Sequence, residues 1–260
     1  MTEETTEFLY ALGEERRIVG ISAYTCRPAH AKNEKPVVSA FIGGSVQKIK
    51  ALAPDLVIGF SDVQAELAHD LIKANLQVLI TNQRSIAEII KTLYLFGSLV
   101  GAEAKAEELI AGYQAHIQHI RDQVPPGPRP KIYFEEWDDP AISAIEWVSE
   151  LIEIAGGEPI FADRATGKAS KARYVEQAEI LERAPDAMIA CWCGKALDRA
   201  SVLNRPGFSE LPAIQHQQLY EMDPAIILQP GPACLTDGLT ELHRIITQVR
   251  SSSPTFQVSR

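Results

Sequence analysis

The chain has 260 residues, which is enough for one large domain or two small ones. Its 46% hydrophobic and 23% charged residues are typical of a globular protein. The net charge of −9 argues against a nucleic-acid-binding surface, which needs clustered Lys and Arg. Four cysteines are too few for a disulfide scaffold at this length, and no apolar run is long enough to span a bilayer.

The first seven residues, MTEETTE, are acidic and polar, whereas a secretory signal needs a basic start and an apolar core. As printed, the chain is therefore expected to stay in the cytoplasm. A periplasmic or other extracytoplasmic location is expected instead if the N-terminus is truncated.

The first third of the chain alternates short apolar runs with amphipathic segments. Strands are predicted at residues 17–22, 55–60 and 77–80, and helices at 45–52 and 64–75. Strands separated by helices imply a parallel sheet whose faces are covered.

Apolar residues at helical spacing then continue from Ile86 to Ile120. Ser85 and Glu88 form a capping-box pattern at the start, and Gly101 is where the helix would bend or split. The proline-rich segment 124–130 ends the run. We interpret this stretch as a helical connection between two α/β lobes.

The second half resumes the alternation of strands and helices. Strands are predicted at residues 131–135 and 187–190, and helices at 146–155, 175–183 and 236–249.

A ten-residue segment occurs twice, 131 residues apart. Residues 49–58 (IKALAPDLVI) and 180–189 (ILERAPDAMI) share two isoleucines and Ala-Pro-Asp in register. The pattern predicts a helix ended by proline, a tight turn and a buried strand. Such a unit is common in α/β proteins, but its presence in both halves favours two similarly built lobes. We therefore expect an N-terminal α/β lobe over 1–84, a connecting backbone helix over 85–124 and a C-terminal α/β lobe over 130–250.

Ligands of open parallel sheets bind beyond the carboxyl ends of the strands. The predicted strand ends lead into loops at 24–28, 60–62, 136–139 and 191–194, which contain Trp137 and Trp192. Large aromatic side chains in such loops indicate a stacking surface for a flat ligand. The alternative is that each Trp packs under its own loop.

Signals for catalysis are weak, because the chain lacks a phosphate loop and the GxSxG, HExxH and GxGxxG motifs. The acidic residues at 135–139 suit acid/base chemistry, but they suit hydrogen bonds to a ligand's amides equally well.

Cys191 and Cys193 would share one face of an extended strand and, with Cys26 and His30, suit a soft metal. However, Cys-x-Cys is a weak metal motif and Cys often fills cores. We therefore expect that the chain is not an enzyme and that it holds neither a metal ion nor a cofactor.

Several segments resemble the periplasmic cobalamin-binding proteins of ABC importers, whose helical-backbone class also binds iron siderophores and haem. In the first half these are GIS-Y…P from Gly20, the aromatic-Gly segment 41–44 and LAPDLVI at 52–58. In the second half, EEWDDP at 135–140, WVSEL at 147–151 and PGP at 230–232 are similar to a subgroup described as cobalamin-binding. The resemblance covers nearly the whole chain. It implies two Rossmann-like lobes with central parallel sheets, joined by a long rigid helix, with a ligand cleft between the lobes.

The resemblance also implies roles for single residues. Tyr24 and Phe41 match positions of aromatic cobalamin contacts, and Glu66 matches a glutamate that docks on the importer's membrane subunit. The second docking position matches Gln229, which is uncharged. The family's first strand and its ligand-contacting loop have no counterpart before Glu3 and Glu4, so the first lobe is expected to lack one strand. The expected ligand-binding residues are Tyr24, Cys26, Phe41, Phe60, Trp137, Asp138, Trp192, Cys193 and Gln229.

The function expected from these observations is the binding of a cobalamin-type corrinoid, with ABC importer membrane subunits as the implied partner. One alternative is another planar or chelated ligand: haem, a siderophore or a modified nucleobase. A second is a metal-dependent enzyme that uses Cys26, Cys193 and the acidic residues 135–139.

Overall fold

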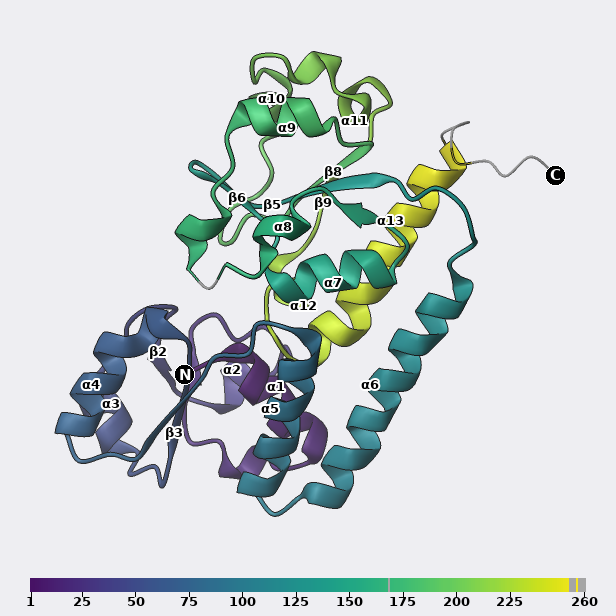
Figure 1. Ribbon diagram of the computed structural model, residues 1–260. Helices are drawn as coiled ribbons and strands as arrows, with labels where there is room; N and C mark the ends of the chain where they lie inside the picture. The colour runs from purple at the N-terminus through teal and green to yellow at the C-terminus, as the bar shows by residue number, and fades with distance from the viewer. Residues whose placement is uncertain (168, 253–255, 257–260) are drawn as a thin grey trace. The chain divides into compact units, whose positions relative to one another are not determined.

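The structure is a computed structural model that describes residues 1–167, 169–252 and 256. The chain divides into two compact units (Figure 1). Unit 1 comprises Met1–Gly112 and Gln229–Pro232, and unit 2 comprises Tyr113–Leu228 and Ala233–Arg260. The short segment Gln229–Pro232, which lies within the C-terminal lobe expected from the sequence, is grouped with unit 1.

Unit 1 contains two pairs of parallel strands. Strand β1 (Ile21–Ser22) pairs with β2 (Val37–Ser39), and β3 (Val57–Phe60) pairs with β4 (Val78–Thr81). The strand predicted at 17–22 is shorter than expected, because Glu15–Arg17 form a 3₁₀ turn, η1. Strand β2 was not predicted from the sequence, because its three residues are too few to show a periodic pattern.

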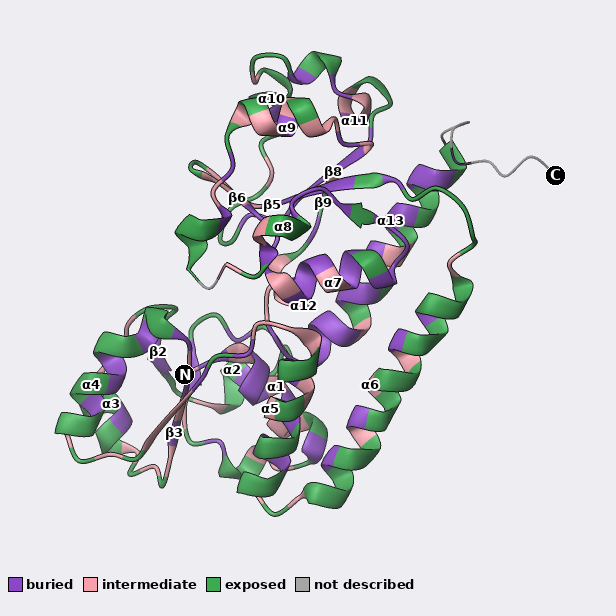
Figure 2. Cartoon of the chain, viewed as in Figure 1, coloured by how far each residue is buried: buried purple, intermediate pink, exposed green. Residues whose placement is uncertain are grey.

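The helices of unit 1 pack on these strands through narrow apolar stripes. Helix α4 (Ala65–Lys73) buries Leu67, Ala68 and Leu71 and exposes its remaining face (Figure 2). Leu67 and Leu71 join a core cluster with Ile49 of α3 (Val46–Ala51) and Val57 of β3. These two helices confirm the predictions at 45–52 and 64–75. The other helical elements before residue 84 are α1 (Glu3–Leu12), α2 (Ala31–Glu34) and η2 (Asp62–Gln64).

The helical run after residue 85 consists of two helices. Helix α5 (Ile86–Leu99) begins with the predicted capping box of Ser85 and Glu88, and α6 (Glu103–Gln123) follows it. Gly101, with φ of 68°, separates them, so the expected split at this glycine is confirmed. The connection is therefore not a single uninterrupted helix over 85–124, and the boundary between the units falls inside α6.

Unit 2 is built on one sheet whose order is β6-β5-β8-β9. The central strands β5 (Lys131–Asp138) and β8 (Ala187–Ala190) are parallel and confirm the two predicted strands. All four residues of β8 are buried, as expected for an apolar central strand covered on both faces. Strands β6 (Ala141–Ser143), β7 (Glu158–Pro159) and β9 (Leu219–Glu221) have two or three residues each and were not predicted.

Two long helices of unit 2 pack together below this sheet. Helix α7 (Glu146–Ile154) lies beside α13 (Leu239–Ser252) in Figure 1, and both bury an apolar face. A Cβ built on Gly157 would lie 2.8–3.0 Å from Ile132, Ile152 and Ile246, so β5, α7 and α13 meet at this glycine. The remaining helical elements are α8 (Ala162–Ala165), η3 (Ser170–Arg173), α9 (Gln177–Arg183), α10 (Arg199–Leu203), η4 (Phe208–Glu210), α11 (Pro212–Gln215), α12 (Pro224–Ile227) and η5 (Cys234–Gly238).

The repeated segment has the same local structure in both units. It forms α3 and β3 in unit 1, and α9 and β8 in unit 2. Ala53 and Ala184, each directly before its proline, both adopt the left-handed conformation, with φ of 45° and 44°. A non-glycine residue rarely takes this conformation, so its presence at both positions supports a common turn. Within the described part of the chain, helices with the length and apolar character needed to cross a bilayer are absent.

Candidate ligand-binding loops

Two aromatic side chains lie together in the strand-end loops of unit 1. Tyr24 follows β1 and Phe41 follows β2, and each side chain is 50% exposed. Their ring centroids are 6.5 Å apart at an interplanar angle of 78°, an edge-to-face contact. Gln64 is buried and donates a hydrogen bond from Nε2 to the Phe41 carbonyl at 3.0 Å, which fixes the backbone beneath the pair.

Phe60, at the end of β3, makes a cation–π contact with Arg84. The Arg84 guanidinium lies 5.2 Å from the ring centroid and forms an ion pair with Asp62 at 3.5 Å. Phe60 is partly exposed, and Glu66 is exposed in the first turn of α4. Glu66 is therefore accessible at the position where the sequence predicted a docking residue.

Cys191 and Cys193, after β8, do not form the arrangement expected from their spacing. Cys191 is buried and Cys193 is exposed, so the prediction that they share a face is wrong, because the strand ends at Ala190. Burial raises the pKa of the Cys191 thiol well above its ordinary value and thereby disfavours the thiolate that binds metals. Cys26 is exposed, and its Sγ donates to the Tyr24 carbonyl at 3.1 Å. Among the described residues, groups of three His, Cys, Asp or Glu suited to a metal ion are absent.

Glu135 is a buried residue of β5, although the sequence placed it at the end of a strand, in an acidic cluster open to a ligand. Its carboxylate accepts two bonds from Arg205, at 2.7 and 2.9 Å. It also accepts bonds from the Tyr133 hydroxyl at 2.7 Å and from Trp192 Nε1 at 3.0 Å. Burial, reinforced by the Glu135 charge, raises the pKa of Tyr133 well above its ordinary value. The Glu135 carboxylate therefore accepts four hydrogen bonds from side chains of unit 2, and it stabilises the interior of that unit.

Glu136 is held by Arg173, which is buried. Arg173 Nη1 lies 2.6 Å from Glu136 Oε2 and also donates to the Ser143 carbonyl at 2.5 Å. Glu136 Oε1 accepts the Ile145 amide at 3.1 Å. Glu136 therefore links β5 to η3 and to Ile145, the residue directly before α7.

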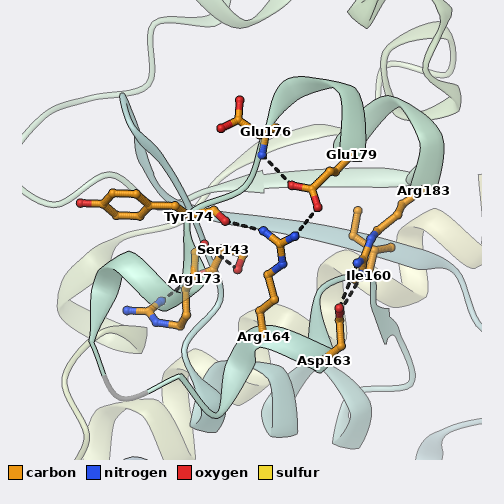
Figure 3. A network of polar contacts seen from close by, with 9 residues as sticks. All are labelled: Ser143, Ile160, Asp163, Arg164, Arg173, Tyr174, Glu176, Glu179 and Arg183. Atoms are coloured by element: carbon orange, nitrogen blue, oxygen red, sulfur yellow. Dashed lines mark hydrogen bonds and ion pairs between the residues drawn. The ribbon is translucent and has the colours of Figure 1, made fainter.

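Further ion pairs continue along this side of unit 2 (Figure 3). Arg164 donates to the Tyr174 carbonyl at 2.5 Å and to Glu179. Arg183 contacts both carboxylate oxygens of Asp163, at 2.6 and 3.0 Å, and this hydrogen bonding lowers the pKa of Asp163. These arginines are paired with carboxylates, so the network stabilises the segment between β7 and α9.

Trp137 and Asp138, at the end of β5, surround the ammonium group of Lys195. Lys195 Nζ lies 2.5 Å from Asp138 Oδ1 and 4.4 Å from the centroid of the Trp137 ring. It also lies 4.9 Å from the Trp192 ring. Partial burial opposes ionisation of Asp138, but the bond from Lys195 prevails and lowers the pKa of this carboxyl group.

The two loop tryptophans differ in their availability to a ligand. Trp192 is 4% exposed, belongs to the core of unit 2 and donates to Glu135. It packs under its own loop, which was the alternative expected from the sequence. Trp137 is partly exposed and is oriented by a bond from Nε1 to the Asp139 carbonyl at 2.9 Å. Lys195 was missed by the sequence reasoning, although it follows Cys193 and Gly194 directly in the loop after β8.

Gln229 is partly buried in the segment that groups with unit 1. Its carbonyl accepts the Gly231 amide at 2.8 Å, and the Pro230 carbonyl accepts Gln83 Nε2 at 3.3 Å. A Cβ built on Gly231 would lie 2.5 Å from the Glu4 Cβ, so the segment lies tightly against α1. Each unit, taken by itself, thus has partly exposed aromatic rings beside polar or charged groups in the loops after its strands.

Comparison with known proteins identifies the family of this chain. The family model described as "Periplasmic binding protein" matches residues 1–226. The chain is 27% identical over 249 residues to an "Uncharacterized ABC transporter substrate-binding lipoprotein YvrC" of Bacillus subtilis (strain 168), covering 91% of this chain and 75% of the relative. It is 23% identical over 209 residues to a "Vitamin B12-binding protein" of Yersinia pestis (strain Pestoides F), covering 79% and 73%.

The fold also matches a solved structure, the periplasmic heme-binding protein RhuT from Roseiflexus sp. RS-1 in apo form. The TM-score is 0.81 at 22% identity, over 95% of this chain and 96% of that chain. The family match covers most of the chain. The chain therefore belongs to the periplasmic binding protein family and is a substrate-binding protein of the ABC-importer type.

Proposed function

We propose that this chain binds a cobalamin-type corrinoid and delivers it to an ABC importer. The observation that carries the proposal is the exposed aromatic pair of Tyr24 and Phe41 at the strand ends of unit 1. Large aromatic rings left half exposed side by side are typical of a ligand-contacting surface. Trp137 supplies a further aromatic face at a strand end in unit 2.

The charge of the chain supports a corrinoid over haem. The net charge is −9, and Asp62 and Glu66 are exposed close in sequence to Phe60. An acidic surface repels the two propionates of haem, whereas the amide groups of a corrinoid donate hydrogen bonds to carboxylates. The similarity to the Yersinia vitamin B12-binding protein supports the same ligand.

Haem is the second candidate, and a specific observation favours it. The Tyr24 side chain is half exposed, and Cys26 beside it is exposed. Tyr and Cys are both known axial ligands of haem iron.

Titration with cyanocobalamin and, separately, with haemin tests the two candidates. We expect saturable binding of cyanocobalamin, measured by calorimetry, with Tyr24→Phe retaining most of the affinity because the ring is kept. Saturable haemin binding that Tyr24→Phe abolishes, without cyanocobalamin binding, would establish the second candidate. Failure to bind cyanocobalamin at high micromolar concentration would refute the first.

We infer that binding, and not catalysis, is the activity of this chain. Glu135, Glu136 and Asp138 are each held in an ion pair, which suits structural support and ligand contact better than proton transfer. A stoichiometric metal found by elemental analysis of the purified protein would instead favour a metal-dependent enzyme.

We propose that Glu66 contacts the membrane subunit of the importer, a role that requires an extracytoplasmic location. Glu66 is exposed on α4, in unit 1. We expect Glu66→Gln to reduce corrinoid uptake by cells while leaving ligand affinity unchanged. Glu107→Gln, at an exposed position of α6, is the matched control, and cell fractionation tests the location.

A further inference from the structure

Lys195 fills a cage of two indole rings and one carboxylate in unit 2. Its ammonium group lies 4.4 Å from the Trp137 ring, 4.9 Å from the Trp192 ring and 2.5 Å from Asp138. Aromatic faces and a carboxylate together are the groups that recognise an ammonium ion. The cage lies where β5 and β8 end, the edge of a parallel sheet at which ligands bind.

The cage lies at the margin of the core: Trp192 belongs to the core, whereas the ion pair of Lys195 and Asp138 reaches solvent. The side chain of Lys195 is 41% exposed and that of Asp138 is 20% exposed. Exposed ion pairs of this kind contribute little stability, because solvent screens them and two side chains lose freedom. The interior of unit 2 is instead held by Glu135 and Arg205, which are more deeply buried.

The loop that carries Lys195 is anchored at both ends. The Cys191 amide donates to the Glu135 carbonyl at 2.9 Å, and the Leu197 amide donates to Glu221 Oε1 at 2.8 Å. Between these anchors, Gly194 adopts φ of 82°, and a Cβ built there would meet no atom within 4 Å. The loop is therefore not packed against other atoms at Gly194, and the Lys195 side chain beside it is 41% exposed.

We propose that Lys195 covers the stacking face of Trp137 and that a flat ligand binds this face by displacing Lys195. This inference rests on the proposed function. It identifies Lys195 as the residue that controls access of the ligand to the Trp137 ring. Trp137 is the ring at issue, because its Nε1 bond to the Asp139 carbonyl keeps it in place when Lys195 leaves. Trp192 stays in the core.

Displacement also sets the class of ligand that this subsite accepts. When Lys195 leaves, the Asp138 carboxylate loses its ion-pair partner and remains beside Trp137. A ligand group that donates hydrogen bonds, such as an amide, then stabilises Asp138, whereas a carboxylate repels it. The subsite therefore favours a flat ring system with amide substituents over one with acidic substituents.

Whether Lys195 covers the Trp137 ring can be measured without a ligand. Trp147 and Trp192 are 3% and 4% exposed, so acrylamide quenching of tryptophan emission reports chiefly on Trp137. We expect Lys195→Met to increase this quenching, because the substitution removes the ammonium from the ring face. Lys195→Arg keeps a cation above the ring and should behave as the wild type, and Lys91→Met, on α5, is a control for loss of a lysine elsewhere.

The decisive experiment titrates wild type, Lys195→Met and Lys195→Arg with cyanocobalamin and with haemin. We expect Lys195→Met to bind cyanocobalamin about fivefold more tightly, which corresponds to about 1 kcal/mol. Weaker binding by Lys195→Met would overturn the proposal, because Lys195 would then contact the ligand. Equal binding of cyanocobalamin by all three proteins would overturn the proposal that Lys195 covers Trp137, but it would leave the proposed function intact. Binding of neither probe by any of them would overturn both the proposed function and the subsite.

Discussion

Glu135 and Arg205 form a buried ion pair that joins two segments 70 residues apart. Arg205 Nη1 and Nη2 donate to the carboxylate, at 2.7 and 2.9 Å, and Glu135 is fully buried. Tyr133 and Trp192 donate to the same carboxylate. A planar guanidinium with two parallel bonds fixes its partner more strictly than an ammonium does. The pair thus determines how the end of β5 meets the segment after α10.

Removing the cation should destabilise unit 2 strongly. We expect Arg205→Met to lower the free energy of unfolding by about 3–5 kcal/mol, because it leaves a buried carboxylate without its counter-charge. Urea denaturation measures the effect. The double variant Glu135→Gln with Arg205→Met removes both charges and should recover part of the loss. A loss below about 1 kcal/mol in the single variant would contradict this role for the pair.

Glu4 should make the stability of the chain depend on pH. The residue is 2% exposed and Oε1 accepts no hydrogen bond, and burial, with a contribution from Glu3, raises the pKa of Glu4 to about 7 from 4.5. The folded state therefore holds a proton that the unfolded state has lost between these two values. The free energy of unfolding should fall as pH rises through this window and level off above about pH 7.

Glu4→Gln stays neutral and removes this penalty. The two pKa values differ by about 2.5, so the variant should exceed the wild type by roughly 3 kcal/mol at pH 8 and by almost nothing at pH 4. Urea denaturation across this pH range measures the difference. Glu107→Gln, at an exposed position, retains Glu4 and should therefore follow the wild type at both pH values. A Glu4→Gln variant that is less stable than the wild type at pH 8 would show that a charged Glu4 is favourable.

Two glycines of the α5 and α6 helices should respond oppositely to the same substitution. A Cβ on Gly97 would lie 2.4 Å from the Ala106 Cβ, whereas a Cβ on Gly112 would meet no atom within 4 Å. Gly97→Ala should therefore destabilise by about 1–3 kcal/mol through overpacking. Gly112→Ala, at an exposed helical position, should stabilise by about 0.5–1 kcal/mol because alanine favours the helix. Thermal unfolding of both variants checks the pair, and equal effects would contradict the close approach of the helices at Gly97.

Phe41 and Trp192 were expected from the sequence to share one role, but their burial separates them. Phe41 is 50% exposed, so Phe41→Ala should weaken cyanocobalamin binding by about 1–3 kcal/mol with little effect on stability. Trp192 is 4% exposed, so Trp192→Ala should lower stability by about 3–5 kcal/mol. Tyr94→Ala, at an aromatic residue of α5 that is 41% exposed, is the control for binding. Unchanged affinity in Phe41→Ala would exclude the Tyr24 and Phe41 pair from the site.

The regular elements with clear periodicity could be predicted from the sequence. The capping box at Ser85, the split at Gly101 and the strand at 187–190 were all expected from local patterns. Strands of two or three residues, such as β7, could not be predicted because so few positions show no alternation. The assignment of a ligand cleft between the lobes and the ligand-binding roles of single residues stay predictions.

The sequence by itself determined the two-fold α/β organisation, the family and the positions of the strand-end loops, because hydrophobic period, proline and glycine act over a few neighbouring residues. Only the tertiary structure decided what each loop residue contacts. Lys195 meets Asp138 across 57 positions, and Trp192 donates to Glu135 across another 57. Such contacts form when packing of the sheet brings side chains from different strands together. A local sequence pattern does not predict them. The same packing placed Trp192 in the core and left Trp137 partly exposed, with the Lys195 ammonium above its ring.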